Sequence, residues 1–399
     1  MIKNQTFVCI ALSTWESEFL NTLVKMMTLL SRENKVLFVD YEYTLKDLIT
    51  RNPRVPVSRV IGLEPRLRTL TTEYGSQVHV LTPPPVLPVN WIKPRIPYRS
   101  LLKLNGLIVK ASIQSAMKTL GIKDPVVVNG YNPFFGLTLA GNLNEKLHIY
   151  YCYDEIKGDQ WYSFHGPSVE EDYIKKTDAV ITTSDALHES KGYLHRKCYV
   201  VKNGVDFENF QAVADFTVKS PHQKKVVGYT GSLDERFDTE TMVYTISRLP
   251  EVEFRFLGRI TNEEAKNRLT PFSNVIFLGS ARPDEVPQYL KEVDVAIIPY
   301  IKSKVTRGVY PLKINEYLAA AKPVVMTDFA PLPEFTKVVR TAESKEQFLN
   351  YLREELYADN YEKKKLRVEF ARKNSWENRV KEFSVIIEKL LTQKPEKVA

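Results

Sequence analysis

Residues 226–232 read VVGYTGS, residues 253–259 read EFRFLGR, and residues 275–280 read VIFLGS. In each stretch an apolar run long enough for a buried strand stops at a glycine. The segments between these runs have helical periodicity. Strands that alternate with helices predict a parallel sheet with helices on both faces. The second half of the chain is therefore expected to be a Rossmann-like α/β domain.

The alternation continues through strands at 295–299 and 323–327 and through three helices, expected at about 239–248, 284–292 and 312–321. The first half opens in the same way, with a strand at 6–12, a helix at about 17–32 and a strand at 35–40. Further strands are expected at 125–129, 148–153, 179–182 and 198–201. A polar stretch at 203–224 suggests the linker. We therefore expect two Rossmann-like, doubly wound domains that face a cleft, with domains at 1–203 and 204–372 and a terminal helix at 373–399 that crosses back.

Composition places the chain among globular enzymes, since 43% of its 399 residues are hydrophobic and 26% are charged. Cys9, Cys152 and Cys198 form no CxxC pair, so neither a zinc site nor a disulfide framework is indicated. This cysteine usage fits a reducing cytoplasm. The sequence has no apolar run of the roughly 18 residues that a membrane helix needs, and no signal-peptide pattern. We expect a cytoplasmic protein, peripheral at the inner membrane face.

The net charge of +8 is unevenly distributed. Residues 51–123 hold twelve Lys and Arg but only two acids, Glu64 and Glu73, a net charge of +10 that leaves −2 for the remainder. Such a stretch attracts an anionic membrane surface or a phosphorylated acceptor, although a solvated basic face is the plain alternative. It lacks a nucleic-acid-binding motif, so no nucleic-acid partner is expected. Within it, the proline-rich residues 82–97 are expected to form a long loop.

The carboxyl ends of the strands are the expected ligand site of an open α/β sheet. Here the strands of the second half end in Gly231-Ser232, Gly258-Arg259 and Gly279-Ser280. Glycine lets a ligand approach the backbone, whose N–H groups can bind phosphate oxygens. Ordinary turn chemistry is the alternative for any single glycine.

Residues 310–325, YPLKINEYLAAAKPVV, are the second feature of this half. Pro311 suits the start of a helix, which places Lys313 in the first turn, where the helix dipole disfavours a cation. A bound anion would relieve that conflict. Lys313 and Glu316 are three residues apart and share a face, so they suit the diphosphate and ribose of one nucleotide sugar. An exposed Lys–Glu helix pair is the alternative.

This P-x-K-x-x-E-Y-x-A-x-x-K-P-V-V pattern resembles the donor-site helix of GT-B glycosyltransferases that build bacterial cell-surface polysaccharides. Residues 228–238, 178–187, 201–206 and 374–379 resemble further segments of that fold. The closest types are teichuronic-acid-type transferases and, more distantly, the xanthan glucuronosyltransferase. The resemblance covers nearly the whole chain and is weakest from about residue 50 to 125.

The resemblance implies a role for each donor-site residue. Lys313 and Arg236 would hold the diphosphate and Glu316 the ribose. Gly231 and Ser232 would lie against the diphosphate or sugar, and Arg259 and Ser280 near the base. Many retaining members carry a second glutamate eight positions before the one that Glu316 matches, but Gly308 stands there, so retention or inversion stays open.

Asp154 follows the expected strand at 148–153, with Glu155 beside it. In the glucuronosyltransferase type, an aspartate at this place resembles the general base for the acceptor hydroxyl. A helix cap is the alternative role for Asp154. Trp15 and Glu16, in the first strand–helix turn, and Glu155 and His165 are further acceptor-side candidates. No DxD-like pair suggests a metal, and no cofactor is expected beyond the nucleotide sugar.

These features predict transfer of a hexose from a nucleotide sugar, expected to be UDP-linked, to a lipid-linked or polysaccharide acceptor. A sugar-nucleotide epimerase on the same double-Rossmann plan is one alternative, although an epimerase needs no basic, membrane-facing stretch. A non-catalytic nucleotide-sugar-binding scaffold in a glycan-assembly complex is the other. Hydrolysis of a nucleotide sugar without acceptor would separate the enzyme from the scaffold.

Overall fold

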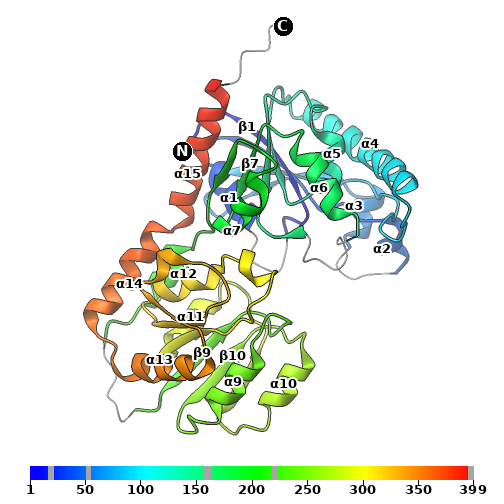
Figure 1. Ribbon diagram of the computed structural model, residues 1–399. Helices are drawn as coiled ribbons and strands as arrows, with labels where there is room; N and C mark the ends of the chain where they lie inside the picture. Colours follow the sequence, from blue (N-terminus) through cyan, green and yellow to red (C-terminus); the bar gives the residue numbers. More distant parts are fainter. Residues whose placement is uncertain (17–21, 51–54, 157–163, 218–222, 394–399) are drawn as a thin grey trace. The chain divides into compact units, whose positions relative to one another are not determined.

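The computed structural model describes residues 1–16, 22–50, 55–156, 164–217 and 223–393 (Figure 1). The chain divides into two compact units. The first contains residues 1–202 together with 380–399, and the second contains residues 203–379. Each unit is an α/β structure built on its own sheet, as the sequence predicts.

The first unit is built on an eight-stranded sheet in the order β3-β4-β2-β1-β5-β6-β7-β8. Its strands are β1 Thr6–Ala11, β2 Lys35–Val39, β3 Leu67–Thr71, β4 Gln77–Leu81, β5 Val126–Gly130, β6 Leu147–Cys152, β7 Ala179–Thr182 and β8 Cys198–Val200. Its helices are α1 Thr22–Leu30, α2 Leu45–Ile49, α3 Val57–Ile61, α4 Arg95–Thr119, α5 Pro133–Leu139, α6 Gly166–Ile174 and α7 Asp185–Gly192. All pairings are parallel except the edge pair β3–β4, which is antiparallel.

The second unit is built on a six-stranded parallel sheet in the order β11-β10-β9-β12-β13-β14. Its strands are β9 Val226–Thr230, β10 Glu253–Leu257, β11 Val275–Gly279, β12 Val295–Ile298, β13 Val324–Thr327 and β14 Val339–Ala342. Its helices are α8 Phe207–Gln211, α9 Thr239–Ile246, α10 Glu263–Leu269, α11 Val286–Lys291, α12 Leu312–Ala319, α13 Lys345–Tyr357 and α14 Tyr361–Lys373, with 3-10 turns η2 Thr306–Gly308 and η3 Pro333–Phe335. The last helix, α15 Trp376–Gln393, begins in this unit and continues into the first.

Helix α4 is the largest departure from the sequence prediction. The proline-rich segment was expected to stay a loop to residue 97, but α4 begins at Arg95, with Pro97 in its first turn, where a proline costs no hydrogen bond. Tyr98, Leu102, Val109 and Ile113 recur at helical spacing and are buried against the sheet. Helices α4, α5 and α6 pack side by side in this unit (Figure 1).

The segment expected to be a linker contributes to the core of the second unit. Within it, α8 buries Phe207 and Phe210 in the core of that unit. At the other end, residues 373–379 belong to the second unit, because Trp376 is fully buried and its backbone bonds to Val205. The division therefore falls within α15, seven residues later than the sequence suggested.

Candidate functional site

The glycines that end β9, β10 and β11 lie at one edge of the second sheet. The amide of Gly231 donates to the carbonyl of Leu257 (2.8 Å), and the amide of Gly258 donates to the carbonyl of Gly279 (2.7 Å). All three have positive φ, at 125°, 147° and 78° respectively. A Cβ on Gly258 would lie 2.1 Å from the carbonyl oxygen of Gly231, so only glycine fits there. The expected clustering of strand ends is thus observed.

Lys313 points at this edge from the start of α12. Its Nζ lies 4.1 Å from the centre of the Tyr229 ring and 5.1 Å from that of Tyr300. A Cβ on Gly231 would come within 2.4 Å of the same Nζ, so the ammonium sits directly over the glycine. Lys313 is only 9% exposed, and no carboxylate of the described residues forms an ion pair with it. A poorly solvated cation without an ion-pair partner, held beside backbone at a strand end, suits an anionic ligand.

Helix α12 is fixed to β9 through one buried tyrosine. The backbone amide of Thr230 donates to the hydroxyl oxygen of Tyr317 (2.8 Å), which ties the middle of the helix to the last residue of the strand. Lys313 is one turn earlier on this helix. This contact therefore sets the depth at which the ammonium reaches the glycine edge.

The alternative of an exposed Lys–Glu pair on α12 is wrong. Lys313 is buried and Glu316 is half-buried, and they form no ion pair within the described residues. Burial raises the pKa of Glu316 to about 7, although the nearby cation of Lys313 acts in the opposite direction. A carboxyl that titrates near neutrality can both accept and donate hydrogen bonds.

Arg236 lies near the Tyr300 ring, but it already forms an ion pair with Asp234. Its Nε and Nη2 donate to the carboxylate of Asp234, at 3.0 and 2.6 Å, and its guanidinium is 5.3 Å from the centre of the Tyr300 ring. Burial opposes ionisation of Tyr300, but the cations of Lys313 and Arg236 hold its pKa below the usual value. A diphosphate held here would have to share Arg236 with Asp234.

The remaining donor-side residues surround the same strand ends. Ser232 accepts a hydrogen bond from the Tyr229 hydroxyl through its carbonyl (2.8 Å). Arg259 is exposed just after β10, where its carbonyl accepts from the Leu233 amide (2.8 Å). Ser280 is exposed just after β11. Tyr229 and Tyr300 are the functional candidates that sequence reasoning missed; both occupy strand-end regions, which is the one signal that could have found them.

The acceptor-side candidates lie in the first unit, and most of them make structural contacts. Glu16 forms ion pairs with Arg59 (3.0 Å) and Arg68 (2.9 Å). Both arginines lower the pKa of Glu16, and Arg68 has the larger effect. The amide of Trp15 donates to Asp40 (2.7 Å). His165 stacks on Tyr98 and is hydrogen-bonded to the carbonyl of Ile92 (2.8 Å), so it holds α4 and α6 together.

Asp154 and Glu155 follow β6, as predicted. Asp154 is exposed, and its Oδ1 accepts from the amide of Glu155 (2.8 Å). Glu155 instead pairs with Lys191 (2.9 Å), whose ammonium also contacts the buried Glu170 (2.7 Å). Of these two acids, Asp154 is therefore the more exposed, and Glu155 is half-buried in an ion pair.

Two buried carboxyls at the same edge were not anticipated. Asp40 and Glu42 follow β2; Asp40 also accepts from the Thr82 hydroxyl (3.1 Å), and Glu42 accepts from the side-chain amide of Asn132 (3.1 Å). Burial raises the pKa of Asp40 to about 6 and that of Glu42 to about 8. Their position after the strand at 35–39 was the available signal.

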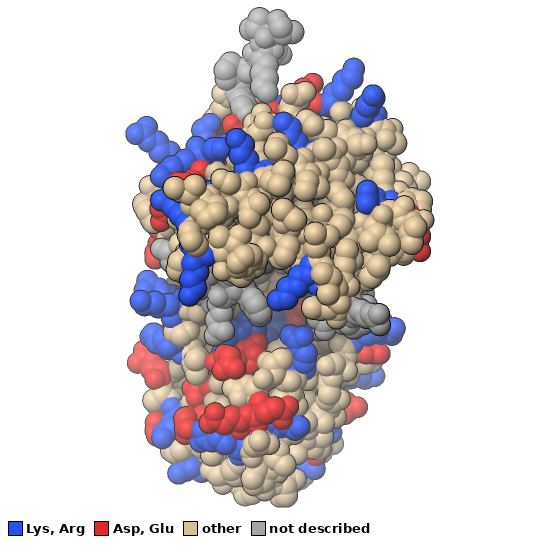
Figure 2. Space-filling model, turned by 90° about the vertical axis from the view of Figure 1, so that its right-hand side faces the viewer, with Lys and Arg blue, Asp and Glu red and all other residues tan. Residues whose placement is uncertain are grey.

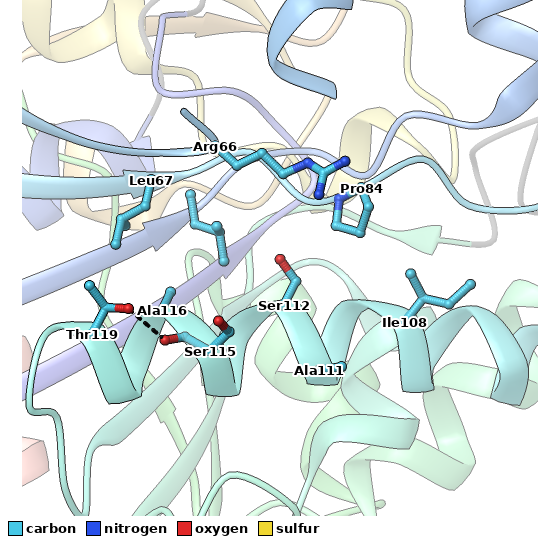
Figure 3. A pocket seen from close by; sticks show the side chains of 10 residues that line it. Arg66, Leu67, Pro84, Ile108, Ala111, Ser112, Ser115, Ala116 and Thr119 are labelled. Atoms are coloured by element: carbon cyan, nitrogen blue, oxygen red, sulfur yellow. Dashed lines mark hydrogen bonds between the residues drawn. The ribbon is translucent and has the colours of Figure 1, made fainter. Parts of the chain in front are cut away.

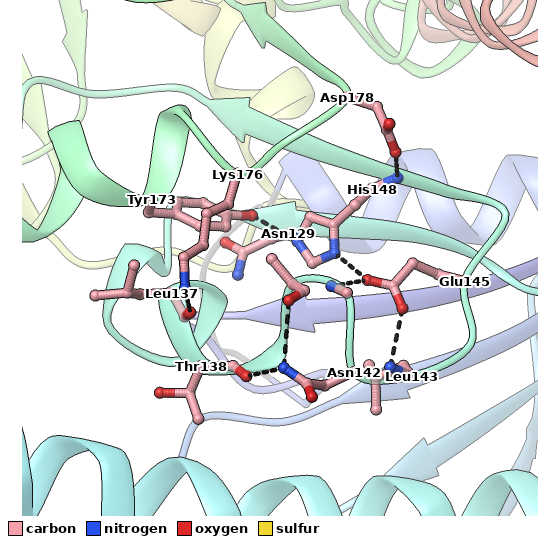
Figure 4. Close-up of polar contacts among 12 residues, drawn as sticks. Asn129, Leu137, Thr138, Asn142, Leu143, Glu145, His148, Tyr173, Lys176 and Asp178 are labelled. Carbon is pink, nitrogen blue, oxygen red and sulfur yellow. Dashed lines mark hydrogen bonds and ion pairs between the residues drawn. The ribbon is translucent and has the colours of Figure 1, made fainter. Parts of the chain in front are cut away.

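A separate polar network lies at the amino end of β6 (Figure 4). The ring of His148 contacts Glu145 (3.0 Å) and the Tyr173 hydroxyl (2.8 Å), while its amide donates to Asp178 (2.8 Å). Burial opposes ionisation of Glu145, but bonds from His148 and from backbone amides lower its pKa to about 2. Four residues of β6, roughly 13 Å of strand, follow His148 before the strand ends, so this network is not part of the edge that carries the candidate base.

Within the described part of the chain, no group of three or more His, Cys, Asp or Glu side chains is arranged to hold a metal ion. Among the same residues, no helix combines the length and apolar character that crossing a membrane requires.

Comparison with known proteins agrees with this geometry. The whole architecture is that of the GT-B glycosyltransferases: the sucrose-phosphate synthase of Thermosynechococcus elongatus superposes with a TM-score of 0.70, at 14% identity, over 98% of this chain and 100% of that one. Anabaena HepE, solved with UDP and glucose, superposes with a TM-score of 0.63, at 14% identity, over 96% and 99%. The predicted fold class is confirmed.

More specifically, residues 224–354 match the family model of glycosyl transferases group 1. The chain is also 32% identical over 180 residues to TuaH of Bacillus subtilis (strain 168), a candidate teichuronic acid biosynthesis glycosyltransferase. That match spans 43% of this chain and 45% of the relative. The resemblance to teichuronic-acid-type GT-B glycosyltransferases, inferred from the motifs, is thereby confirmed, and the residues that match the group 1 model lie in the second unit.

Proposed function

We propose that the protein transfers a hexose from a UDP-linked sugar to a lipid-linked or polysaccharide acceptor at the inner membrane face. The observation that carries the proposal is the Lys313 ammonium, buried over Gly231 at the glycine-lined strand ends and without a carboxylate partner among the described residues. The match to TuaH supports an acceptor in cell-surface polysaccharide synthesis, and the presence of UDP and glucose in HepE supports the donor class.

In this proposal the second unit binds the donor. Lys313 and the amino end of α12 face the diphosphate, Glu316 binds the ribose, and Arg236 moves between Asp234 and the phosphates. The charge of Lys313 and of the helix end takes the place of a metal ion, and the nucleotide sugar is the only small molecule required. Gly231, Ser232, Arg259 and Ser280 line the remainder of the donor site.

The first unit then supplies the acceptor side, with Asp154 as general base for the attacking hydroxyl. The contacts of Glu16, Glu155 and His165 within this unit favour positioning roles for these three, and the amide of Trp15 donates to Asp40 at the carboxyl edge.

The basic stretch supports peripheral attachment to an anionic membrane. Arg51 and Arg54 lie outside the described residues, but α4 exposes Lys103 and Leu107 on one face, and Ile96, seven residues before Lys103, is 81% exposed. The upper part of Figure 2 shows Lys and Arg around a broad uncharged area of the first unit. Apolar side chains ringed by cations suit the interface of an anionic leaflet.

A thermal-shift screen against nucleotide sugars tests the donor assignment. A ligand present at about 100 times its dissociation constant stabilises the protein by about 2.7 kcal/mol. We expect the largest shift with UDP-sugars, followed by slow release of UDP in the absence of acceptor. Binding without release of UDP would favour a scaffold, and absence of any shift would contradict the proposal.

Vesicle sedimentation tests the membrane assignment. We expect the protein to sediment with anionic vesicles at low salt, to be released at high salt, and to remain in solution with neutral vesicles. Equal behaviour with both vesicle types would favour a soluble acceptor.

A further inference from the structure

A cavity of about 480 Å³ lies in the first unit, between the β3–β4 pair and α4 (Figure 3). This volume is within the range of about 300–1,000 Å³ that is usual for small-molecule sites. Leu67, Leu81 and Pro84 form one wall. The opposite wall is a stripe of α4 that contains Ile108 and Ala111 and meets the buried face of the helix at Ala116. Most of the lining is therefore aliphatic.

The polar groups of the cavity are one cation and a row of hydroxyls. Figure 3 shows the Arg66 side chain extending towards Pro84, with its guanidinium above Ser112, while Ser115 and Thr119 follow along the helix. The Thr119 hydroxyl donates to the carbonyl of Ser115 (3.1 Å). Among the described residues, neither Ser112 nor Ser115 has a hydrogen-bond partner for its hydroxyl. Donors for an anion thus stand beside an apolar channel.

Arg66 is the feature that selects the ligand. Its Nη2 donates to the carbonyl of Val60 (3.0 Å), and within the described part of the chain its buried Nε has no acceptor and its guanidinium forms no ion pair. The neighbouring Arg68, by contrast, is neutralised by Glu16. Gly62, which ends α3 with φ of 85°, leaves room for the guanidinium: a Cβ there would lie 3.2 Å from Nη2. An arginine with unused donors is a phosphate-binding group.

We propose that this cavity binds the hydrocarbon chain of a lipid phosphate, with the phosphate at Arg66 and the chain between β4 and α4. None of the described residues that line the cavity carries a carboxylate or an aromatic ring, so these walls match neither a sugar nor a nucleobase. The proposal concerns a site apart from the strand ends that bind the donor and does not depend on transferase activity. A membrane phospholipid and the lipid carrier of an acceptor share this chemistry.

Titration of the full chain with decyl phosphate, below its micellar concentration, tests the proposal. We expect saturable binding of one molecule, and up to about a fourfold gain in affinity for each added methylene until the chain outgrows the cavity. Arg66→Gln should weaken decyl phosphate about ten- to a hundredfold and leave decanol unchanged. Ala111→Trp, on the exposed side of the cavity, should weaken both ligands.

Lys118→Gln is the matched control, because it removes one charge from the same helix outside the cavity. An equal loss in Arg66→Gln and Lys118→Gln, binding that never saturates, or binding that survives both cavity variants would overturn the proposal. Farnesyl phosphate and a lysophosphatidic acid then identify the source: tighter binding of the first indicates an isoprenoid carrier, and of the second a membrane phospholipid. Weaker binding of the preferred lipid phosphate by Arg66→Gln supports the site.

Discussion

The carboxyl edges of the two sheets carry different chemical groups. In the second unit the edge consists of backbone at three glycines, with the Lys313 ammonium over one of them. In the first unit it consists of carboxyls that the protein itself engages: Glu16 with two arginines, Glu155 with Lys191, and Asp40 with the Trp15 amide. The second sheet therefore leaves its carboxyl edge ready for an anion, whereas contacts within the first unit engage these acids of the first edge.

This difference separates residues that bind from residues that position. An anion-binding edge needs a hydrogen-bond donor that no carboxylate already occupies, and Lys313 is such a donor, whereas Glu16 and Glu155 are themselves acceptors. Asp154 differs from these acids in the first unit, since it is exposed and its Oδ1 accepts a hydrogen bond from the amide of Glu155. In the proposed function, Asp154 on the first edge is therefore the general base, and the second edge binds the donor.

The largest expected effect follows from Asp154. Asp154→Asn retains the shape and removes the base, so turnover should fall by about 10²- to 10⁴-fold, the usual contribution of general-base catalysis. Affinity for UDP should stay within about twofold, because Lys313 and Glu316 belong to the other unit. Steady-state rates together with UDP titration measure both quantities. Asp172→Asn, at a half-buried acid of the same unit that pairs with Arg99, is the control. Near-normal turnover in Asp154→Asn would remove the base assignment.

Lys313→Ala should have the next largest effect. It removes a charge-assisted contact of roughly 1.5–3 kcal/mol, so UDP should bind about ten- to a hundredfold more weakly. Lys266→Ala removes a half-buried lysine of α10, which pairs with Glu263 in the same unit, and this variant should bind UDP normally. Calorimetric titration of both variants gives the comparison. Equal affinity for every nucleoside diphosphate in Lys313→Ala and wild type would show that the open edge is not the donor site.

Gly231→Ala should reproduce part of that loss. The new Cβ would lie 2.4 Å from Nζ, but Nζ ends a flexible side chain and can move, so about a tenfold loss of UDP affinity is expected. Added to Lys313→Ala, the same change should cost little more, because both act on one contact. Gly279→Ala tests whether backbone strain alone weakens UDP binding. An alanine at a φ of 78° costs about 1–2 kcal/mol of stability. Because no atom of the described residues lies near the new Cβ, UDP binding should persist. If the losses of UDP affinity in Gly231→Ala and Lys313→Ala were additive in the double variant, Gly231 and Lys313 would not act on one contact.

Backbone-determined features were the ones that the sequence predicted. Apolar runs that end in glycine located the strands and the edge of the second sheet, and Pro311 located the start of α12. Helix α4 was missed because Pro97 suggested a loop, although a proline is tolerated in a first turn.

The side-chain partners could not be predicted. Glu155 and Lys191 are 36 residues apart, and the rings of Tyr229 and Tyr300 meet Lys313 only through tertiary packing. No local pattern records such contacts, because pairing across strands and helices depends on the completed fold.

The smallest expected effect is on the pH dependence of stability, and it arises from Glu42, the buried carboxyl at the edge of the first sheet. Its pKa is raised to about 8, whereas a glutamate in an unfolded chain has a pKa of about 4.3. Between these pH values the folded protein keeps the Glu42 carboxyl protonated, while the unfolded chain has lost that proton. The stability that Glu42 contributes is therefore complete below about pH 4 and is lost as the pH rises towards 8, with a slope of at most about 1.4 kcal/mol per pH unit.

Glu42→Gln resembles the protonated form and can still accept from Asn132. Urea unfolding between pH 5 and 8 should show a shallower decline for this variant than for wild type, and higher relative stability at pH 8. Glu64→Gln, an exposed acid, should leave the wild-type slope unchanged. Since Glu42 belongs to the first unit, saturating UDP should stabilise wild type and Glu42→Gln equally at each pH. A UDP-dependent difference between their slopes would mean that the first edge also responds to the donor.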